Sequence, residues 1–372
     1  MTVLEDIDRA LATVIDPELR KPITELGMVA GRRIDGGAVT VEVLLTISGC
    51  PLRDTITRDV DAAVAGLPGV TSVAVQLGVM TQEQRDRLKE QLRGPAGAKG
   101  IPFNDEGSLT RVYAVASGKG GVGKSSVTVN LAVAMAAQGL RVGIVDADVY
   151  GFSVPSLLGI SQPPTRVDEM ILPPVAYDVK VISIGMFISG NQPVAWRGPM
   201  LHRALEQFLS DVHFGDLDVL FLDLPPGTGD IAISVAQLLP SSELLVVTTP
   251  QTAAADVAER AGTIASQTGQ KVSGVIENMS WLELPGGERM ELFGTGGGPA
   301  LAGRLTEAMG YPVPLLGSIP LEIALREGGD SGSPIVAGAS ESAAARELRT
   351  IALTLARRPR GLDNLRLKVT PS

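Results

Sequence analysis

The amino-terminal part of the chain has the hydrophobic pattern of a small α+β domain. Residues 38–46 alternate between apolar and polar positions, which is the period of a half-buried strand. Apolar residues then recur at four-residue spacing over 56–64, which indicates a helix that buries one face. A second alternating segment, 70–77, precedes a polar, helix-forming segment over 81–92. We therefore expect a small α+β domain over residues 1–92.

The pattern changes beyond residue 108, where apolar segments alternate with helical ones. This alternation predicts an α/β domain with a mostly parallel sheet covered by helices on both faces. The alanine-rich segment 340–355 predicts a closing helix. Residues 93–108 have the glycine and proline density of a linker, so the α/β domain is expected over 109–372. The predicted strands are residues 111–116, 141–145, 181–184, 219–222, 244–248, 271–276 and 313–316.

Composition narrows the class of protein. The chain has 372 residues, one cysteine, two histidines and a net charge of −9. A single cysteine excludes an intrachain disulfide scaffold, and so few nitrogen and sulfur ligands argue against a zinc enzyme. The acidic amino terminus and the shortness of the apolar runs predict a cytoplasmic protein with no membrane partner. The negative charge argues against a nucleic-acid partner.

A glycine-rich segment between a predicted strand and a helix carries the main functional signal. Residues 117–125 read SGKGGVGKS and match G-x-x-x-x-G-K-[ST] in the strand–loop–helix context that the motif requires. In such a loop, backbone N–H groups surround phosphates, the lysine adds positive charge and the serine hydroxyl binds Mg²⁺. The sequence thus predicts a P-loop NTPase. The ATP-binding residues expected in this segment are Gly118, Lys119, Gly120, Gly121, Val122, Gly123, Lys124, Ser125 and Ser126.

The same glycines also fit a second pattern. Gly118, Gly120 and Gly123 match the G-x-G-x-x-G of dinucleotide-binding Rossmann domains. That motif has no need of Lys124 and Ser125, whereas a P-loop requires both. The P-loop interpretation is therefore favoured.

Acidic side chains follow two of the predicted strands. Asp146 and Asp223 each come directly after an apolar strand, where a parallel sheet places its ligand crevice. An acid in this position holds Mg²⁺ in P-loop proteins, either directly or through water. Asp223 and Ser125 are therefore the expected Mg²⁺ ligands.

Lys119 is a second lysine, at the start of the loop, and it indicates a particular class. The segment resembles the deviant P-loop ATPases, which include the septum-site ATPase MinD, the partition ATPase ParA, the nitrogenase iron protein and the Mrp/ApbC iron–sulfur carriers. The resemblance implies a homodimer in which Lys119 reaches the partner's phosphates. It further implies an Mg²⁺-linked role for Asp146, a water-positioning role for Asp148 and an adenine contact for Asn278. The catalytic residues expected on this basis are Lys119, Lys124 and Asp148.

Structural interpretations of these positions stay open at this point. Lys119 alone also fits a solvated loop lysine. One of Asp146 and Asp148 also fits a cap for the next turn, and Asn278 fits an Asx turn after a strand.

Further segments resemble the Mrp/ApbC branch in particular. In chain order they read GKGGVGKS, DADVYGFSVPSLLG, MFISG, WRGPM, LDLPPGTGD, TTPQ, IENMS and FGTGGG. In the amino-terminal domain, DPE at 16–18, ELGMV at 25–29 and TISGCP at 46–51 resemble the small domain of iron–sulfur assembly factors. The resemblance implies a protein that binds and hydrolyses ATP with Mg²⁺ and delivers an iron–sulfur cluster to apoproteins or assembly factors.

The cluster ligands are incomplete in this chain. Mrp/ApbC carriers usually place C-x-x-C shortly after the NMS segment, so that two subunits supply four thiolates. Residues 280–288 here read SWLELPGGE, and Cys50 is the one thiolate candidate in the sequence. Its place between a predicted strand and helix favours a lowered thiol pKa, because a helix N-terminus stabilises the thiolate. A buried, inert thiol is the alternative.

A second function of a different class is a MinD/ParA-like positioning or scaffold ATPase that carries no cluster. Residues 357–372 show no long amphipathic face for a membrane and only a short basic cluster for DNA. These features argue against the second function.

Overall fold

The computed structural model describes residues 4–47, 49–50, 52–93, 100–105, 107–149, 151–187, 198–227, 230–251, 265–266, 268–338 and 341–358. The chain divides into two compact units. Unit 1 comprises Met1–Lys99, Pro164–Pro174 and Asp211–Gly215, and unit 2 comprises Gly100–Pro163, Val175–Ser210 and Asp216–Ser372. The boundary after residue 99 falls inside the predicted linker, of which residues 94–99 and 106 lie outside the described residues.

Unit 1 is built around a three-stranded sheet. β1 (Val29–Asp35) pairs antiparallel with β2 (Ala38–Leu45), which pairs parallel with β3 (Ser72–Val79). Its helices are α1 (Leu4–Leu11), α2 (Arg53–Ala65) and α3 (Gln82–Arg93). The predicted alternation in β2 and the four-residue spacing in α2 both bury their apolar side chains in one core. The sequence pattern did not indicate β1, because Arg32 and Arg33 interrupt its alternation.

Unit 1 also contains a hairpin from a later part of the chain. β6 (Thr165–Val167) pairs antiparallel with β7 (Met170–Leu172). Val167, Met170 and Leu172 are at most 1% exposed and join the apolar core of this unit. Thr165 Oγ1 donates a hydrogen bond of 2.7 Å to Glu18 Oε1, and both side chains are buried. The sequence analysis did not predict this hairpin, whose strands are too short to show a period.

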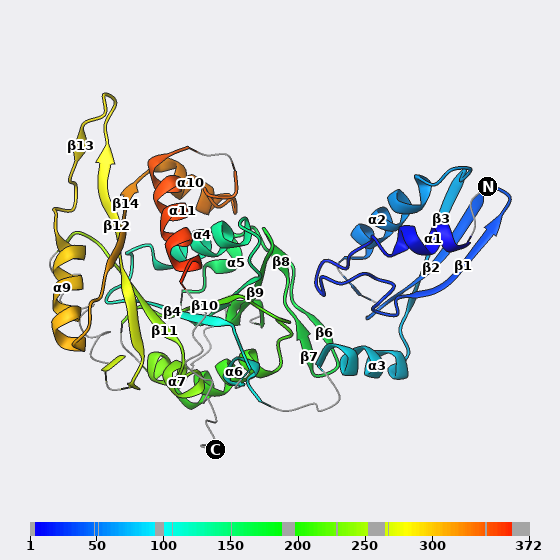
Figure 1. Cartoon of the computed structure of the whole chain (residues 1–372), viewed down its shortest axis with the longest axis horizontal. Coiled ribbons are helices and arrows are strands. Elements are labelled where there is room, and N and C mark those ends of the chain that lie inside the picture. The colour runs from blue at the N-terminus through cyan, green and yellow to red at the C-terminus, as the bar shows by residue number, and fades with distance from the viewer. Residues whose placement is uncertain are drawn as a thin grey trace, which may run out of the picture. The chain divides into compact units, whose positions relative to one another are not determined.

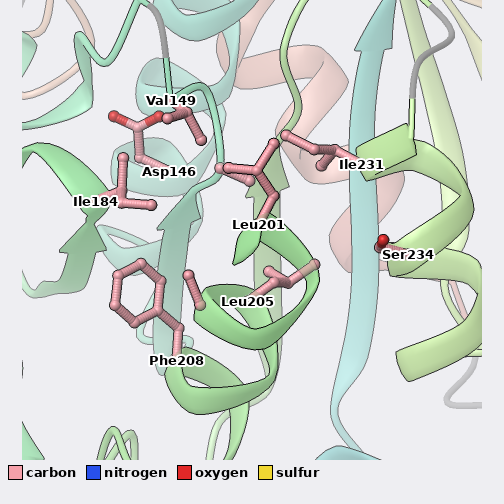
Figure 2. A pocket seen from close by; sticks show the side chains of 10 residues that line it. Asp146, Val149, Ile184, Leu201, Leu205, Phe208, Ile231 and Ser234 are labelled. Atoms are coloured by element: carbon pink, nitrogen blue, oxygen red, sulfur yellow. The ribbon is translucent and has the colours of Figure 1, made fainter. Parts of the chain in front are cut away.

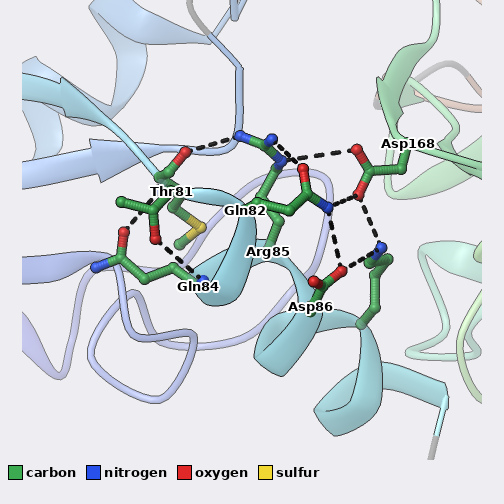
Figure 3. A network of polar contacts seen from close by, with 8 residues as sticks. Thr81, Gln82, Gln84, Arg85, Asp86 and Asp168 are labelled. Atoms are coloured by element: carbon green, nitrogen blue, oxygen red, sulfur yellow. Dashed lines mark hydrogen bonds and ion pairs between the residues drawn. The ribbon is translucent and has the colours of Figure 1, made fainter.

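Polar contacts join the turn of this hairpin to α3, as Figure 3 shows. Asp168 accepts hydrogen bonds from Gln82 Nε2 at 3.1 Å and Lys89 Nζ at 2.7 Å, and Arg85 Nε lies 3.7 Å from its Oδ1. Asp86, on α3 itself, accepts from Gln82 and lies 2.7 Å from Lys89. We call these five residues the Asp168 network.

Unit 2 contains a mostly parallel sheet. In its described residues, nine strands follow the order β13-β12-β11-β4-β10-β5-β9-β8, with β14 paired to β12. The pairings are parallel except those of β8 with β9 and of β12 with β13. Each of the seven predicted strands overlaps one of these strands. The strands are β4 (Arg111–Ser117), β5 (Val142–Asp146), β8 (Val175–Ala176), β9 (Val179–Ser183), β10 (Val219–Asp223), β11 (Glu243–Thr248), β12 (Lys271–Glu283), β13 (Arg289–Met290) and β14 (Leu315–Leu321).

Helices cover both sides of this sheet, which confirms the predicted α/β architecture. In Figure 1, α4 (Lys124–Ala136) and α11 (Ala343–Ala356) lie on one side, and α6 (Gly198–Ser210) and α7 (Asp230–Leu238) lie on the other. α4 is buried along most of its length, as expected of a helix that packs between a sheet and α11. Within the described residues, the other helices are η1 (Pro102–Asn104), α5 (Val154–Leu157), η2 (Ile184–Phe187), α9 (Gly297–Met309) and α10 (Ile323–Asp330).

The predicted closing helix corresponds to α11. In the part of the chain that the structure describes, no helix combines the length and the apolar character that crossing a bilayer requires.

Candidate functional site

The predicted P-loop joins the end of β4 to the start of α4. Gly121 and Gly123 have φ angles of 79° and 78°, in the left-handed region that glycine adopts without strain. A Cβ atom on Gly123 would lie 2.3 Å from Asn278 Nδ2, so a side chain at this position would displace Asn278 of β12 from the loop. The loop therefore opens α4 with its first N–H groups free of intrahelical partners, as phosphate binding requires.

A cation and a carboxylate are buried together at the first turn of α4. Lys124 Nζ lies 2.7 Å from Asp223 Oδ1, with the two side chains 6% and 0% exposed. Ser125 Oγ donates to Asp223 Oδ2 at 2.5 Å, and Thr128 Oγ1 donates to Asp223 Oδ1 at 2.9 Å. The structure thus brings together Lys124, Ser125 and Asp223, three residues that the sequence analysis singled out.

Asp146 lies beside this cluster. β5 and β10 pair in register, with Asp146 opposite Asp223, and β9 places Ser183 on the other side of Asp146. Asp146 accepts hydrogen bonds from Ser183 Oγ at 3.0 Å and from the backbone N–H groups of Asp148 and Val154. Burial and then the negative charge of Asp223 raise the pKa of Asp146 to about 7.

Asp146 lines a small pocket whose other lining residues are mostly apolar. The pocket has a cavity volume of about 20 Å³, room for one water molecule, and is much too small for a nucleotide. Figure 2 shows Asp146 beside Val149 and Ile184 at one side of the pocket. Apolar side chains of α6, and Ile231 of α7, also line it. The lining residues are Asp146, Ala147, Val149, Ile184, Leu201, Ala204, Leu205, Phe208, Ile231 and Ser234. Such a wall solvates a carboxylate poorly, so it favours the protonated form.

Asp148 and Asp146 both stabilise local turns. Asp148, which is 8% exposed, accepts a hydrogen bond of 3.0 Å from the N–H of Gly151. The turn-capping interpretation thus describes contacts that both aspartates make. Their roles toward water and Mg²⁺ stay predictions.

Lys119 and Asn278 contact other parts of the site. Lys119 Nζ donates to Gln251 Oε1 at 2.5 Å, just beyond β11. Asn278 Nδ2 donates to the carbonyl of Val122 at 2.8 Å, whereas its buried Oδ1 has no hydrogen-bond partner within the described residues. Asn278 therefore supports the P-loop and keeps one acceptor unused; its adenine contact stays a prediction.

The oxygen atoms at this site fit Mg²⁺. Mg²⁺ is usually held by one or two carboxylates together with substrate phosphates and water. Asp146 and Asp223 stand on adjacent strands with Ser125 Oγ beside Asp223, and burial together with the repulsion between the two carboxylates raises the pKa of Asp146. A divalent cation would relieve that repulsion.

Cys50 does not have the environment of a reactive thiol. It is 9% exposed and belongs to the apolar core of unit 1. Burial, with smaller contributions from the charges of Glu18 and Asp16, raises the pKa of its thiol, although the N–H of Leu52 opposes this. The expected lowering of the pKa is thus wrong, because desolvation outweighs the backbone contact. The structure supports the buried alternative.

Sequence reasoning missed several residues that hold these groups in place. Thr128 lies one turn after Lys124 and reaches the same carboxylate, a spacing that could have revealed it. Ser183 and Gln251 could not be found from motifs, because each depends on which strands or loops become neighbours. Parts of the segments singled out in the sequence lie outside the described residues: 188–190 of MFISG, 196–197 of WRGPM, 228–229 of LDLPPGTGD, Tyr150 of DADVYGFSVPSLLG, and Ser48 and Pro51 of TISGCP. Residues 359–372 also lie outside them.

Two protein-family models match this chain. The model of the NUBPL iron-transfer P-loop NTPase family matches residues 108–356, and that of the iron–sulfur cluster assembly protein family matches residues 4–77. A relative from Mycobacterium tuberculosis H37Rv, named iron–sulfur cluster carrier protein, is 60% identical over 98% of this chain and 96% of its own. A Synechocystis relative of the same name is 41% identical, over 96% of this chain and 98% of its own.

A solved structure of a nucleotide-binding protein is similar to part of this chain. The nucleotide-binding protein of Archaeoglobus fulgidus, in complex with ADP, is 36% identical and has a TM-score of 0.52. The similarity covers 61% of this chain and 91% of that protein. Since one family model spans well over half of the 372 residues, this chain belongs to the NUBPL iron-transfer P-loop NTPase family.

Proposed function

We propose that this protein is an ATP-dependent iron–sulfur cluster carrier. The observation that carries the proposal is the buried contact of Lys124 and Ser125 with Asp223, at the end of a P-loop. Relatives named iron–sulfur cluster carrier protein span nearly the whole chain, which favours this function over a MinD/ParA-like positioning role.

Nucleotide binding begins with charge. The P-loop N–H groups and the Lys124 ammonium surround the phosphates of ATP, while Asp223 loses the lysine as its partner. Asn278 Oδ1 is an acceptor for the amino group of adenine, because its Nδ2 is already engaged by Val122. Lys124 thus exchanges the carboxylate of Asp223 for the phosphates of ATP. Its ammonium is already buried beside Asp223, so nucleotide binding requires no further desolvation of the lysine.

Ser125, Asp223 and Asp146 would hold Mg²⁺. When bound, the ion supplies positive charge that neutralises the phosphate oxygens during phosphoryl transfer. Ser183 and Thr128 keep the two carboxylates oriented by donating hydrogen bonds to them. These contacts fix the orientation of both carboxylates toward the proposed Mg²⁺ position.

Asp148 and Lys119 have separate proposed roles in ATP hydrolysis. Asp148 orients the attacking water. Lys119 leaves Gln251 and reaches the phosphates bound by a second copy of the chain, so the active unit is a homodimer. Both roles are carried over from the deviant P-loop class by the position of these residues in the motifs.

The cargo requires ligands from outside the chain. An all-cysteine cluster site takes four thiolates, whereas two copies of this chain contain two cysteines, both of them the buried Cys50. The described residues also contain no group of three or more His, Cys, Asp or Glu side chains arranged to bind a metal. We therefore propose that an acceptor apoprotein, an assembly factor or a small thiol completes the ligand shell, in the cytoplasm, where thiols stay reduced.

Anaerobic reconstitution tests the proposal. Iron and sulfide are measured per chain, with and without glutathione, for the wild-type protein and for Cys50→Ser. We expect cluster binding only when the external thiol is present. A chain that binds no cluster in either condition, and delivers none to an apo-ferredoxin, contradicts the carrier function.

A further inference from the structure

A second glycine-rich segment lies beside the nucleotide site and has no role in the function proposed above. Residues 293–298 read FGTGGG and open α9, with Gly296 as the N-cap at a φ of 82°. α9 packs against β12 and β14. Because neither phosphate-binding motif includes these glycines, their packing needs an explanation of its own.

The first turn of α9 fits tightly against the residues that follow β11 and against Glu277 in the middle of β12. A Cβ atom on Gly297 would lie 2.5 Å from the carbonyl oxygen of Pro250 and 2.6 Å from that of Thr249. A Cβ atom on Gly298 would lie 2.9 Å from both Cβ and Oε2 of Glu277. Real side chains do not approach so closely, so glycine is required at both positions for α9 to pack this closely.

Glu277 closes this contact with a hydrogen bond. Its Oε2 accepts from the N–H of Gly298 at 2.6 Å, and its side chain is 6% exposed. A carboxylate in the first turn of a helix satisfies one of the N–H groups that the helix leaves unpaired and is favoured by the helix dipole. Glu277 thus ties α9 to β12 at a buried point.

The Glu277–Gly298 contact lies next to two residues that support the P-loop, Asn278 and Gln251. Glu277 stands opposite Thr248 in the β11–β12 register, and Asn278, which follows it, donates to the P-loop carbonyl of Val122. Beyond Thr248 the chain runs past Gly297 to Gln251, which accepts the hydrogen bond from Lys119. Displacement of α9 would therefore move both supports of the P-loop.

We propose that Glu277 is a positioning residue for nucleotide binding, which acts through α9 to place Asn278 and Gln251 against the P-loop. This inference rests on the proposed function only in requiring that the P-loop binds nucleotide. In this proposal the glycines of FGTGGG allow α9 to pack closely against β12 and the residues after β11, so that Glu277 can accept the hydrogen bond from Gly298.

The test is the dissociation constant of Mg-ADP, measured by titration calorimetry on the full chain. Glu277→Ala removes the acceptor, and we expect affinity to fall about tenfold, the effect of losing one hydrogen bond to a charged group. Glu277→Gln keeps an oxygen acceptor of the same shape, and we expect it to stay within about twofold of wild type. Thermal unfolding of each variant is followed in parallel.

Glu243→Ala is the matched control. Glu243 is a glutamate at the start of β11, paired with Ser273 and 3.5 Å from Arg358, at the strand end opposite the P-loop. We expect Glu243→Ala to lower stability without changing the Mg-ADP constant. Wild-type affinity in Glu277→Ala, equal losses in Glu277→Ala and Glu243→Ala, or no rescue by Glu277→Gln would each overturn the inference. If wild-type protein itself fails to bind Mg-ADP, the proposed function fails with it, and that result is distinguishable from the others.

Discussion

Two lysine–aspartate pairs in this protein have the same separation and opposite surroundings. Lys124 and Asp223 lie 2.7 Å apart with side chains 6% and 0% exposed, and Lys89 and Asp168 lie 2.7 Å apart with side chains 27% and 31% exposed. Equal geometry does not mean equal energy. Desolvation makes the buried pair costly to form and more costly to break singly, whereas water screens the exposed pair.

The surroundings also move the carboxylate pKa values in opposite directions. Around the buried pair, burial and Asp223 raise the pKa of Asp146 to about 7. In the Asp168 network, the hydrogen bond from Lys89, then that from Gln82, lowers the pKa of Asp168. The buried cluster thus has two carboxylates, Asp146 and Asp223, against the single cation of Lys124, and this deficit of positive charge suits a site that takes up a cation. The exposed network is already neutralised, which suits a structural contact.

The largest effect is expected from removing the buried cation. Lys124→Ala leaves Asp223 buried without its partner, so the free energy of unfolding should fall by about 3 kcal/mol. Without the lysine, ATP hydrolysis should fall by roughly 10²-fold or more, because developing phosphate charge loses a donor. Urea unfolding and phosphate release measure the two effects. Lys89→Ala is the matched exposed control, and equal losses in both variants would show that burial does not matter here.

Asp148→Ala should separate hydrolysis from binding. The carboxylate is assigned to the attacking water, so turnover should fall by about 10²-fold while the Mg-ADP constant changes little. The loss of the Gly151 contact will add a small decrease in stability. Steady-state turnover and calorimetry measure the two quantities. Wild-type turnover in this variant would mean that another group positions the water.

The pH dependence of stability should reveal Asp146 in nucleotide-free protein kept in chelator. Between its unfolded pKa and about 7, the folded state retains a proton that the unfolded state has lost. Stability should therefore decrease as the pH rises from about 4 to about 7, by at most about 1.4 kcal/mol per pH unit. Asp146→Asn should flatten this slope, as should saturating Mg-ADP. A slope that survives both changes must come from another group.

The smallest effect is expected at the exposed network. Asp168→Asn keeps a residue that tolerates the φ of 55° but removes the charge, so stability should fall by at most about 1 kcal/mol, and less in high salt. Because the pKa of Asp168 is lowered, its contribution should be present at neutral pH and disappear as the pH falls below about 4. Urea unfolding at low and high salt measures it.

Asp86→Asn is the control for that experiment. Asp86 contacts Gln82 and Lys89 within α3, whereas Asp168 joins the β6–β7 hairpin to α3. Hydrogen exchange in residues 164–174 should quicken in Asp168→Asn and stay unchanged in Asp86→Asn. Equal exchange in the two variants would show that the charge of Asp168 does not hold the hairpin.

Local motifs made much of the nucleotide site predictable. The P-loop can be recognised from nine consecutive residues, 117–125. Asp146 and Asp223 could be placed near it because parallel strands end at the same edge of a sheet. The strands of unit 2 were predictable for a similar reason, since burial on both faces leaves a continuous apolar run. Each of these signals depends on neighbours in sequence.

Contacts between distant segments were beyond sequence reasoning. Ser183 reaches Asp146 only because β9 pairs with β5. Glu277 reaches Gly298 in α9, a helix that begins twenty residues later in the chain. Cys50 was expected at an activated helix end, but its pKa depends on how the core of unit 1 closes over it. The β6–β7 hairpin belongs to unit 1 because Val167, Met170 and Leu172 are buried in its core. Strands of three residues are too short to show a hydrophobic period from which this packing could be predicted.

The measurement that tests the central claim most directly is ATP-dependent transfer of a reconstituted cluster to an apo-ferredoxin. Wild-type protein and Lys124→Ala are loaded anaerobically to the same iron content and compared with and without Mg-ATP. The account predicts that Mg-ATP accelerates transfer from wild type and has no effect on Lys124→Ala. Transfer that is equally fast in both proteins, or unchanged by Mg-ATP in wild type, would contradict an ATP-dependent carrier.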